Sequence, residues 1–361
     1  MPRRNRIPAA LAVLTAALVV AACGPGPGSS GQASVPSAGC LPTGAPTLGP
    51  AGGCHGSETP IPLKVGLGYL PSVQFAPFYL AQQAGYYRDA GLDVTFENKI
   101  DPDLITLVGQ GALDLGVADG TSVIPAVSQA IPIRYVATIY GTFPSIVFAK
   151  ASSGINTAAD LRGKTIGIPG KYGSSWIMLQ TLLQSGGLTV DDVTVETYPE
   201  YGQGVAVQQG VIAAATGFAN NEPVQLELSG SPAVVLHIDD VVALPGPGLI
   251  AGTTTLDTKG NAVKAFIAAT LRAMTEIAAT PSLGLDAAIV AVPELGTDRA
   301  TQAAILDATI ASWSPASGGG DFGTIDTVGW EASIALMTTM KLVPNPVTVE
   351  GLVRTDLLPP S

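Results

Sequence analysis

From residue 61 onward the chain alternates short β-rich runs with helical patterns, and this alternation restricts the fold more than any other feature. A chain of this kind buries its strands in a mostly parallel sheet that helices cover on both faces. The sequence therefore predicts an α/β fold. The first unit has strand-like runs at Leu63–Leu67, Leu92–Phe96 and Leu113–Val117, with helical patterns over about 75–89 and 102–110 between them.

A second unit of the same kind begins near Ala151. It has a short capped helix at Thr157–Gly163, strands at Lys164–Ile168, Asp191–Tyr198 and Ala213–Phe218, and a helix at Ser175–Gln184. After about Pro245–Pro247 the apolar spacing becomes helical, at Lys259–Ala279, Asp298–Ser312 and Thr327–Met340.

The first 22 residues have the pattern of a secretory leader. Three arginines precede an apolar run from Ile7 to Ala22, and Cys23 follows Val-Ala-Ala. This junction resembles the bacterial lipobox, in which the cysteine thiol is acylated, so we expect a lipid on Cys23. An ordinary signal or an anchor helix is the alternative, although the run is shorter than the ~20 residues that a membrane span needs.

Residues 23–60 form a predicted disordered tether. From Gly24 to Pro60 the chain holds 10 Gly and 7 Pro in 37 residues, and Glu58 is its only charged residue. Such a segment buries too little apolar surface to offset its chain entropy. Cys40 and Cys54 could pair in an oxidising exterior or stay free.

Composition excludes several classes of function. The 17 Lys and Arg against 28 Asp and Glu give a net charge of −11, which argues against nucleic acid as a partner. With 3 Cys and 2 His we expect no metal site. The chain is 47% hydrophobic and 12% charged, yet from Ile61 onward no window is apolar for the ~20 residues of a membrane span.

Aromatic residues gather where the predicted strands end. Ligands of open α/β sheets bind outside the carboxyl ends of the strands, and a flat ligand stacks on aromatic rings. Phe78 and Tyr79 lie inside a predicted helix and fit a core equally well. The better candidates for a stacking pocket are Tyr69, Phe75, Tyr140 and Tyr172.

Two polar pairs accompany these rings. Ser174 and Ser175 stand at a predicted helix N-terminus, where they hold an anion or a polar ligand edge, unless Ser174 is only a cap. Asn221 and Glu222 precede Pro223 and can read the donor and acceptor edge of a nitrogen heterocycle, or form a solvated turn.

Catalytic motifs are missing from the sequence. The loop Gly167–Gly173 lacks the spacing of a phosphate loop, because Lys171 is followed by Tyr172. His237 lies in an apolar run and is expected to be a strand residue. We expect neither an enzyme nor a cofactor.

Two stretches resemble a known family. Leu67–Ala81, with Gly85–Tyr87 and Gly91–Val94, is similar to the opening of substrate-binding proteins of ABC importers for thiamine pyrimidine precursors, sulfonates, taurine and nitrate. Asp160–Pro169 is similar to the segment that starts their second lobe.

The resemblance implies a two-lobed periplasmic-binding-protein fold of type II, with crossings near Phe148–Ser152 and Pro245–Ile250. Residues 61–150 with 248–361 would form the first lobe, and 151–247 the second. It also implies a small-molecule ligand, an ABC permease as partner and an extracytoplasmic, lipid-anchored monomer.

The family pattern carries a set of ligand-binding residues onto this chain, namely Gln74, Phe75, Asp119, Tyr140, Tyr172–Ser175, Asn221 and Glu222. An aromatic heterocycle fits these residues and the acidic body better than an anion does, and the motifs look closer to the riboflavin-binding branch than to the pyrimidine branch. The alternatives are a sulfonate-, taurine- or nitrate-binding protein and, in another class, a pyrimidine precursor synthase, an enzyme that would need neither lipobox nor tether.

Overall fold

The structure is a computed structural model that describes residues 59–100, 103–242, 244–314 and 320–360. The expected leader, the lipidated Cys23, and Cys40 and Cys54 of the expected tether lie outside these residues. Within the described ranges, no helix combines the length and the apolar character that crossing a bilayer requires.

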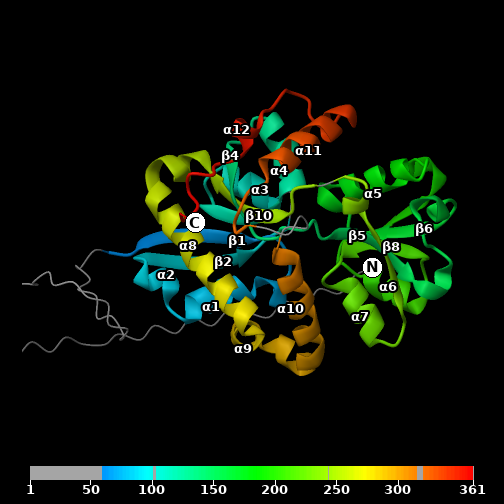
Figure 1. Ribbon diagram of the computed structural model, residues 1–361, viewed down its shortest axis with the longest axis horizontal. Coiled ribbons are helices and arrows are strands. Elements are labelled where there is room, and N and C mark those ends of the chain that lie inside the picture. Colours follow the sequence, from blue (N-terminus) through cyan, green and yellow to red (C-terminus); the bar gives the residue numbers. More distant parts are fainter. Residues whose placement is uncertain (1–58, 101–102, 243, 315–319, 361) are drawn as a thin grey trace, which may run out of the picture. The chain divides into compact units, whose positions relative to one another are not determined.

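Two five-stranded sheets organise the described chain (Figure 1). The strands of the first sheet are, in spatial order, β2 (Leu92–Asn98), β1 (Ile61–Leu67), β3 (Leu115–Asp119), β10 (Pro247–Gly252) and β4 (Ile133–Thr138). Those of the second sheet are β7 (Thr194–Thr197), β6 (Thr165–Ile168), β8 (Ala214–Phe218), β5 (Ser145–Lys150) and β9 (Ala233–His237). Each sheet with its helices is called a lobe below.

The two sheets share one pattern of strand directions. In the first, β1 is parallel to β2 and β3, whereas β10 is antiparallel to both β3 and β4. In the second, β6 is parallel to β7 and β8, whereas β5 is antiparallel to both β8 and β9. One strand in each sheet thus runs against the other four, which confirms the prediction of mostly parallel sheets.

The two reversed strands, β5 and β10, are those that follow a crossing between the lobes. The expected crossing near Phe148–Ser152 is wrong, because Ser145–Lys150 pairs within the second sheet. The chain crosses at residues 139–144, where Gly141 and Pro144 interrupt an otherwise apolar run. The return crossing ends before Pro247, since Pro247–Gly252 is a buried strand of the first sheet and not part of the connection. Residues 145–150 therefore belong to the second lobe, and residue 247 to the first.

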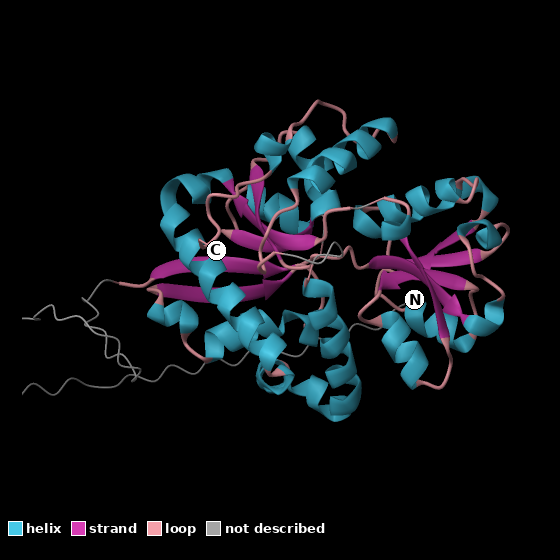
Figure 2. Ribbon diagram, viewed as in Figure 1, coloured by secondary structure: helices cyan, strands magenta, loops and turns pink. Residues whose placement is uncertain are grey.

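Helices cover both faces of each sheet (Figure 2). One face of the first sheet packs against α1 (Ala76–Gln83), α2 (Tyr86–Asp89), α8 (Thr253–Ala279), α9 (Pro281–Ala291) and α10 (Arg299–Trp313). The other face packs against α3 (Asp103–Gly109), α4 (Gly120–Ser128), α11 (Thr327–Thr339) and α12 (Val349–Leu352). In the second lobe α5 (Gly173–Ser185) covers one face, and α6 (Gln203–Gln209) and α7 (Glu222–Leu228) cover the other.

Two helical predictions change at single residues. The helix expected over 75–89 divides at Gly85, whose φ of +81° ends α1 and starts α2. The helix expected from Lys259 extends back to Thr253, but the backbone leaves helical geometry at Lys259. There the Lys259 ammonium lies 2.9 Å from the Asp114 carboxylate and 2.9 Å from the Pro62 carbonyl.

The capped turn expected at Thr157 is confirmed, since Thr157 and Asp160 form a capping box.

Candidate ligand-binding site

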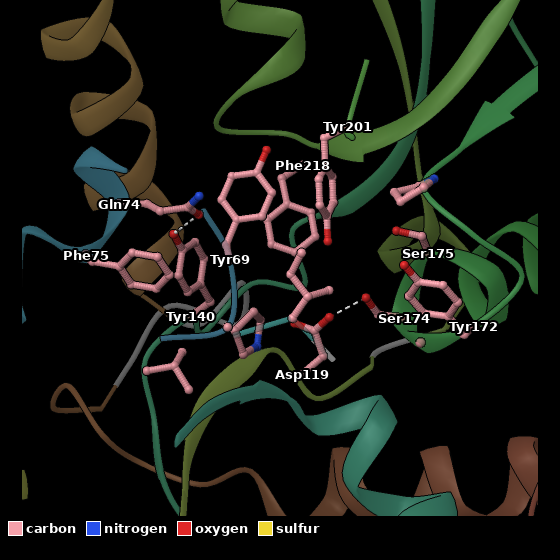
Figure 3. Close-up of a pocket in the computed structure, with 16 residues that line it drawn as sticks. Tyr69, Gln74, Phe75, Asp119, Tyr140, Tyr172, Ser174, Ser175, Tyr201 and Phe218 are labelled. Carbon is pink, nitrogen blue, oxygen red and sulfur yellow. Dashed lines mark hydrogen bonds between the residues drawn. The ribbon is translucent and has the colours of Figure 1, made fainter. Parts of the chain in front are cut away.

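A pocket lies where the carboxyl ends of strands from both sheets meet (Figure 3). It encloses about 710 Å³ between its lining atoms, part of it open to solvent. Residues at or just after the ends of β1, β2, β3 and β4, with Pro247 at the start of β10, contribute one wall. Residues at or just after the ends of β6, β7 and β8 contribute the other. The lining residues are Gly68, Tyr69, Gln74, Phe75, Ile100, Val117, Asp119, Tyr140, Pro169, Tyr172, Gly173, Ser174, Ser175, Tyr201, Phe218 and Pro247.

The loop after β1 reaches the pocket because it crosses the end of β3 closely. A Cβ on Gly68 would lie 2.2 Å from the Val117 carbonyl oxygen, so only glycine fits there. Ser72 then caps a short 3₁₀ turn, Val73–Phe75, by accepting a hydrogen bond from the Gln74 amide at 3.4 Å. This turn directs Gln74 and Phe75 into the pocket, where both are largely buried.

Tyr140 links the two lobes through a buried hydrogen-bond network. Its hydroxyl donates to Gln74 Oε1 at 3.1 Å and accepts from Asn220 Nδ2 at 3.5 Å. The same Asn220 amide donates to Thr309 Oγ1 at 2.8 Å. Asn220 follows β8 in the second lobe, whereas the other three residues belong to the first. Burial raises the pKa of the Tyr140 phenol, so the hydroxyl remains a donor.

Asp119 and Ser174 form a second bond between the lobes. Asp119 ends β3, and its carboxylate accepts a hydrogen bond from Ser174 Oγ in the first turn of α5 (Figure 3). The N-cap residue of α5, Tyr172, makes no side-chain capping bond. Asp119 therefore supplies the negative group that a helix N-terminus favours. Burial raises the pKa of Asp119 to about 6, although the bond from Ser174 opposes the shift.

Aromatic rings from both lobes face one another across the pocket. Tyr69 and Tyr201 make an edge-to-face pair with ring centroids 4.9 Å apart, and Phe218 lies between them and Asp119 in Figure 3. Tyr172 stands at the second-lobe side with 41% of its surface exposed. These rings offer faces on which a flat ligand can stack.

Eight of the residues predicted from sequence line this pocket, and two do not. Tyr69, Gln74, Phe75, Asp119, Tyr140, Tyr172, Ser174 and Ser175 line it, whereas Asn221 and Glu222 do not. These two residues border a separate side pocket, which Tyr69 and Tyr201 also line. Glu222 Oε2 accepts a hydrogen bond from the Phe218 amide at 2.8 Å, and burial raises the pKa of this carboxyl to about 7.

Sequence reasoning missed Tyr201, Phe218 and Asn220. Phe218 ends a strand that was predicted correctly, so the rule that placed Asp119 could have found it. Tyr201 follows the edge strand β7 and has a positive φ of 57°, which no pattern indicated. Phe78 and Tyr79, left open between pocket and core, are buried in the core of the first lobe.

Charged and metal-binding groups are few around the site. None of the lining residues named above is Lys, Arg, His or Cys. His237 is an exposed residue of β9, in agreement with the prediction of a strand. In the part of the chain that the structure describes, no three His, Cys, Asp or Glu side chains are grouped to hold a metal ion.

Residues 72–283 match the NMT1/THI5-like family. The chain belongs to this family. Riboflavin-binding protein RibY of Chloroflexus aurantiacus is 31% identical over 324 residues, which cover 88% of this chain and 91% of RibY. A 4-amino-5-hydroxymethyl-2-methylpyrimidine phosphate synthase of Legionella pneumophila is 28% identical, over 61% of this chain and 71% of the synthase.

Solved structures share the fold of this NMT1/THI5-like chain. The alkanesulfonate-binding protein SsuA of Xanthomonas axonopodis pv. citri, bound to MOPS, superposes with a TM-score of 0.66 at 20% identity, over 83% of this chain and all of SsuA. The periplasmic aliphatic sulphonate binding protein SsuA of Escherichia coli gives 0.65 at 18% identity, over 81% and 97% of the two chains. The likeness shows the two-lobed fold of periplasmic binding proteins, as predicted.

Proposed function

We propose that this protein is the extracytoplasmic substrate-binding component of an ABC importer and that it holds a small aromatic nitrogen heterocycle between its lobes. One observation carries the proposal: the pocket joins aromatic faces to hydrogen-bonding groups, and both lobes contribute to each kind of group. A pocket of this composition can bind and orient a flat molecule with a polar edge without reacting with it.

In the proposed complex the ring system stacks among Tyr69, Phe218 and Tyr201, and Tyr172 contacts it from the second-lobe side. Its polar edge meets Gln74 and Asp119 from the first lobe and Ser174 and Ser175 from the second. A carboxylate and a hydroxyl together match the N–H and C=O groups that line the edge of a heterocycle. A ligand held from both sides stabilises the closed arrangement of the lobes, which the permease then meets.

Riboflavin is our first choice of ligand. The relative that carries the name riboflavin-binding protein aligns over 91% of its length, and aromatic rings from both lobes line the pocket. A thiamine pyrimidine precursor is the runner-up within the same class of heterocycles.

An anionic ligand, such as a sulfonate, suits the pocket less well. No cationic side chain is among its lining residues within the described chain, and Asp119 already faces the N-terminus of α5. An anion there would lie beside a carboxylate without a compensating Lys or Arg. The lining also lacks His and Cys, which favours binding over catalysis in this pocket.

The location of the protein follows from the leader in the same proposal. Cleavage before Cys23 and acylation of its thiol would anchor the chain, and the tether would let the two-lobed body reach the permease. We expect a monomer, since one chain supplies both walls of the pocket.

A binding titration tests the proposed function. The full chain, purified from membranes in detergent, is titrated with riboflavin, hydroxymethylpyrimidine and taurine, with fluorescence and thermal unfolding as readouts. We expect riboflavin to raise the unfolding temperature most, because a ligand that binds the native state stabilises it. We expect Tyr172→Ala to weaken riboflavin about tenfold, since one stacking contact contributes roughly 1–3 kcal/mol.

The neighbouring exposed residue provides the matched control for this titration. Lys171→Ala alters the same loop without removing a lining ring, so its affinity should stay that of the unaltered chain. Riboflavin that produces no thermal shift, or taurine that produces the largest one, would count against the proposal.

A further inference from the structure

The side pocket next to the ligand-binding pocket is lined mainly by two helices of the second lobe. Gly204, Val205 and Gln208 come from α6, and Asn221, Glu222, Gln225 and Leu226 come from the start of α7. With Tyr69 and Tyr201 they surround about 460 Å³, part of it open to solvent. The proposed function assigns no role to this cavity.

Two tyrosines separate the side pocket from the main one. Tyr69 and Tyr201 line both cavities, and their rings meet edge to face at 4.9 Å. They stand side by side in Figure 3, one from each lobe. A ring system that stacks against this pair therefore lies next to the side pocket, across the wall that the two cavities share.

The polar groups of the side pocket are amides and one carboxylate. Asn221 Oδ1 accepts a hydrogen bond from Gln225 Nε2 at 2.8 Å, and Gln208 is exposed on α6. No Lys or Arg is among the residues that line the cavity in the described chain. Such a set both donates and accepts hydrogen bonds but offers no positive charge to balance an anion.

The chain keeps space for the carboxylate of Glu222. A Cβ on Gly217 would lie 2.8 Å from Glu222 Oε2, and one on Gly204 would lie 3.2 Å from its Cγ. The Phe218 amide donates to the same oxygen at 2.8 Å. Two glycines and a backbone donor thus fix this acceptor in the wall of the side pocket. The pKa of the neighbouring Tyr69 phenol is raised, first by burial of that phenol and then by the charge of Glu222.

We propose that the side pocket is a subsite for an uncharged polyhydroxyl chain attached to the stacked ring. Hydroxyl groups donate to the carboxylate and amide oxygens and accept from the amide N–H groups, so they match every polar side chain present. A terminal phosphate on that chain would meet Glu222 without a cation. The proposal rests on the proposed function, because it needs the ring to occupy the main pocket.

Two flavins that differ only in this chain provide the test. Riboflavin carries a ribityl chain, whereas lumiflavin carries a methyl group at the same ring nitrogen. The full chain in detergent is titrated with each by fluorescence quenching, and a Gln208→Ala/Gln225→Ala double variant is compared with it. We expect the variant to lose about tenfold in riboflavin affinity, since each lost hydrogen bond costs about 0.5–1.5 kcal/mol, and to keep lumiflavin affinity within about twofold.

The adjacent exposed Gln209 gives the matched control, because it lies on α6 outside the side pocket. Gln209→Ala should change neither affinity. If the double variant lost affinity equally for both flavins, or lost none for riboflavin, the subsite would be overturned. Binding of lumiflavin to the unaltered chain would still support the proposed function. If the unaltered chain bound neither flavin, the proposed function and the subsite would fall together.

Discussion

At the scale of single residues, the most consequential groups are the carboxyls of Asp119 and Glu222, because burial raises their pKa values toward neutral pH. The pKa of Asp119 rises to about 6 and that of Glu222 to about 7, from ordinary values of 3.8 and 4.5. In each case desolvation is the main cause, and a hydrogen bond to the carboxylate opposes it. Between pH 4 and 7 the folded chain therefore binds more protons than the unfolded chain.

This excess of protons predicts that the protein is more stable in mild acid. Because the folded pKa values are raised, the contribution of these carboxyls to stability is full below the unfolded values and is lost as pH rises through 6 and 7. We expect the free energy of unfolding of the ligand-free chain, from urea titration, to be on the order of 4 kcal/mol greater at pH 5 than at pH 8, because Asp119 loses about one pH unit of linkage and Glu222 about two over this range.

Removing the two carboxyls gives the control for this pH dependence. An Asp119→Asn/Glu222→Gln double variant should show a much smaller difference between pH 5 and pH 8. A chain that is more stable at pH 8, or a double variant with an unchanged difference, would show that these carboxyls do not titrate as described.

Site residues were predictable where a strand end fixes them. Tyr69 and Asp119 follow buried strands whose carboxyl ends must share one edge of the sheet, so sequence placed them correctly. The same rule could not distinguish the positions of Asn220, Asn221 and Glu222. Their directions depend on where β8 ends and α7 begins. Asn220 donates to Tyr140, whereas Asn221 and Glu222, the next two residues, line the side pocket.

At the scale of the elements, glycine has opposite effects in a loop and in a helix. Gly68→Ala should destabilise the fold, because the new Cβ would lie 2.2 Å from a backbone oxygen of β3. Gly260→Ala should stabilise it by about 0.5–1 kcal/mol, since the new Cβ meets no atom within 4 Å outside the adjacent backbone of α8, and alanine favours the helix. Urea unfolding of both variants measures the two effects, and a stabilised Gly68→Ala would contradict the packing described here.

Two strands escaped prediction because of their composition or position. Pro247–Gly252 begins with Pro-Gly, a turn signal, yet it is buried and pairs between β3 and β4. Ser145–Lys150 is apolar like the strand before it, so the sequence does not show that the chain has already crossed to the other sheet. Local patterns thus predicted the elements, whereas sheet membership depends on pairing between distant segments.

At the scale of the whole molecule, the lobes bond to each other directly within the pocket. Ser174 donates to Asp119, and Asn220 donates to Tyr140. A ligand shifts a balance between open and closed lobes only by its differential affinity for the two. These bonds favour the closed arrangement before any ligand binds. They therefore offset part of the free energy that closing the lobes requires.

The Ser174–Asp119 bond can act either as a latch or as a barrier, and one variant distinguishes the two roles. If it is a latch, Ser174→Ala populates the open form and increases the ligand-free radius of gyration in X-ray scattering. It also weakens riboflavin, through the lost closed fraction and through the lost Ser174 contact with the ligand. A hydrogen bond to a charged group contributes about 1.5–3 kcal/mol, so we expect a loss of about tenfold or more. Saturating riboflavin should restore the compact radius.

Ser175→Ala, which alters the next residue of the same helix turn, should leave the ligand-free radius unchanged. An unchanged radius with tighter binding in Ser174→Ala would instead mean that the ligand must break this bond to enter. In that case Ser174 occupies the Asp119 carboxylate until the ligand replaces it as hydrogen-bond partner.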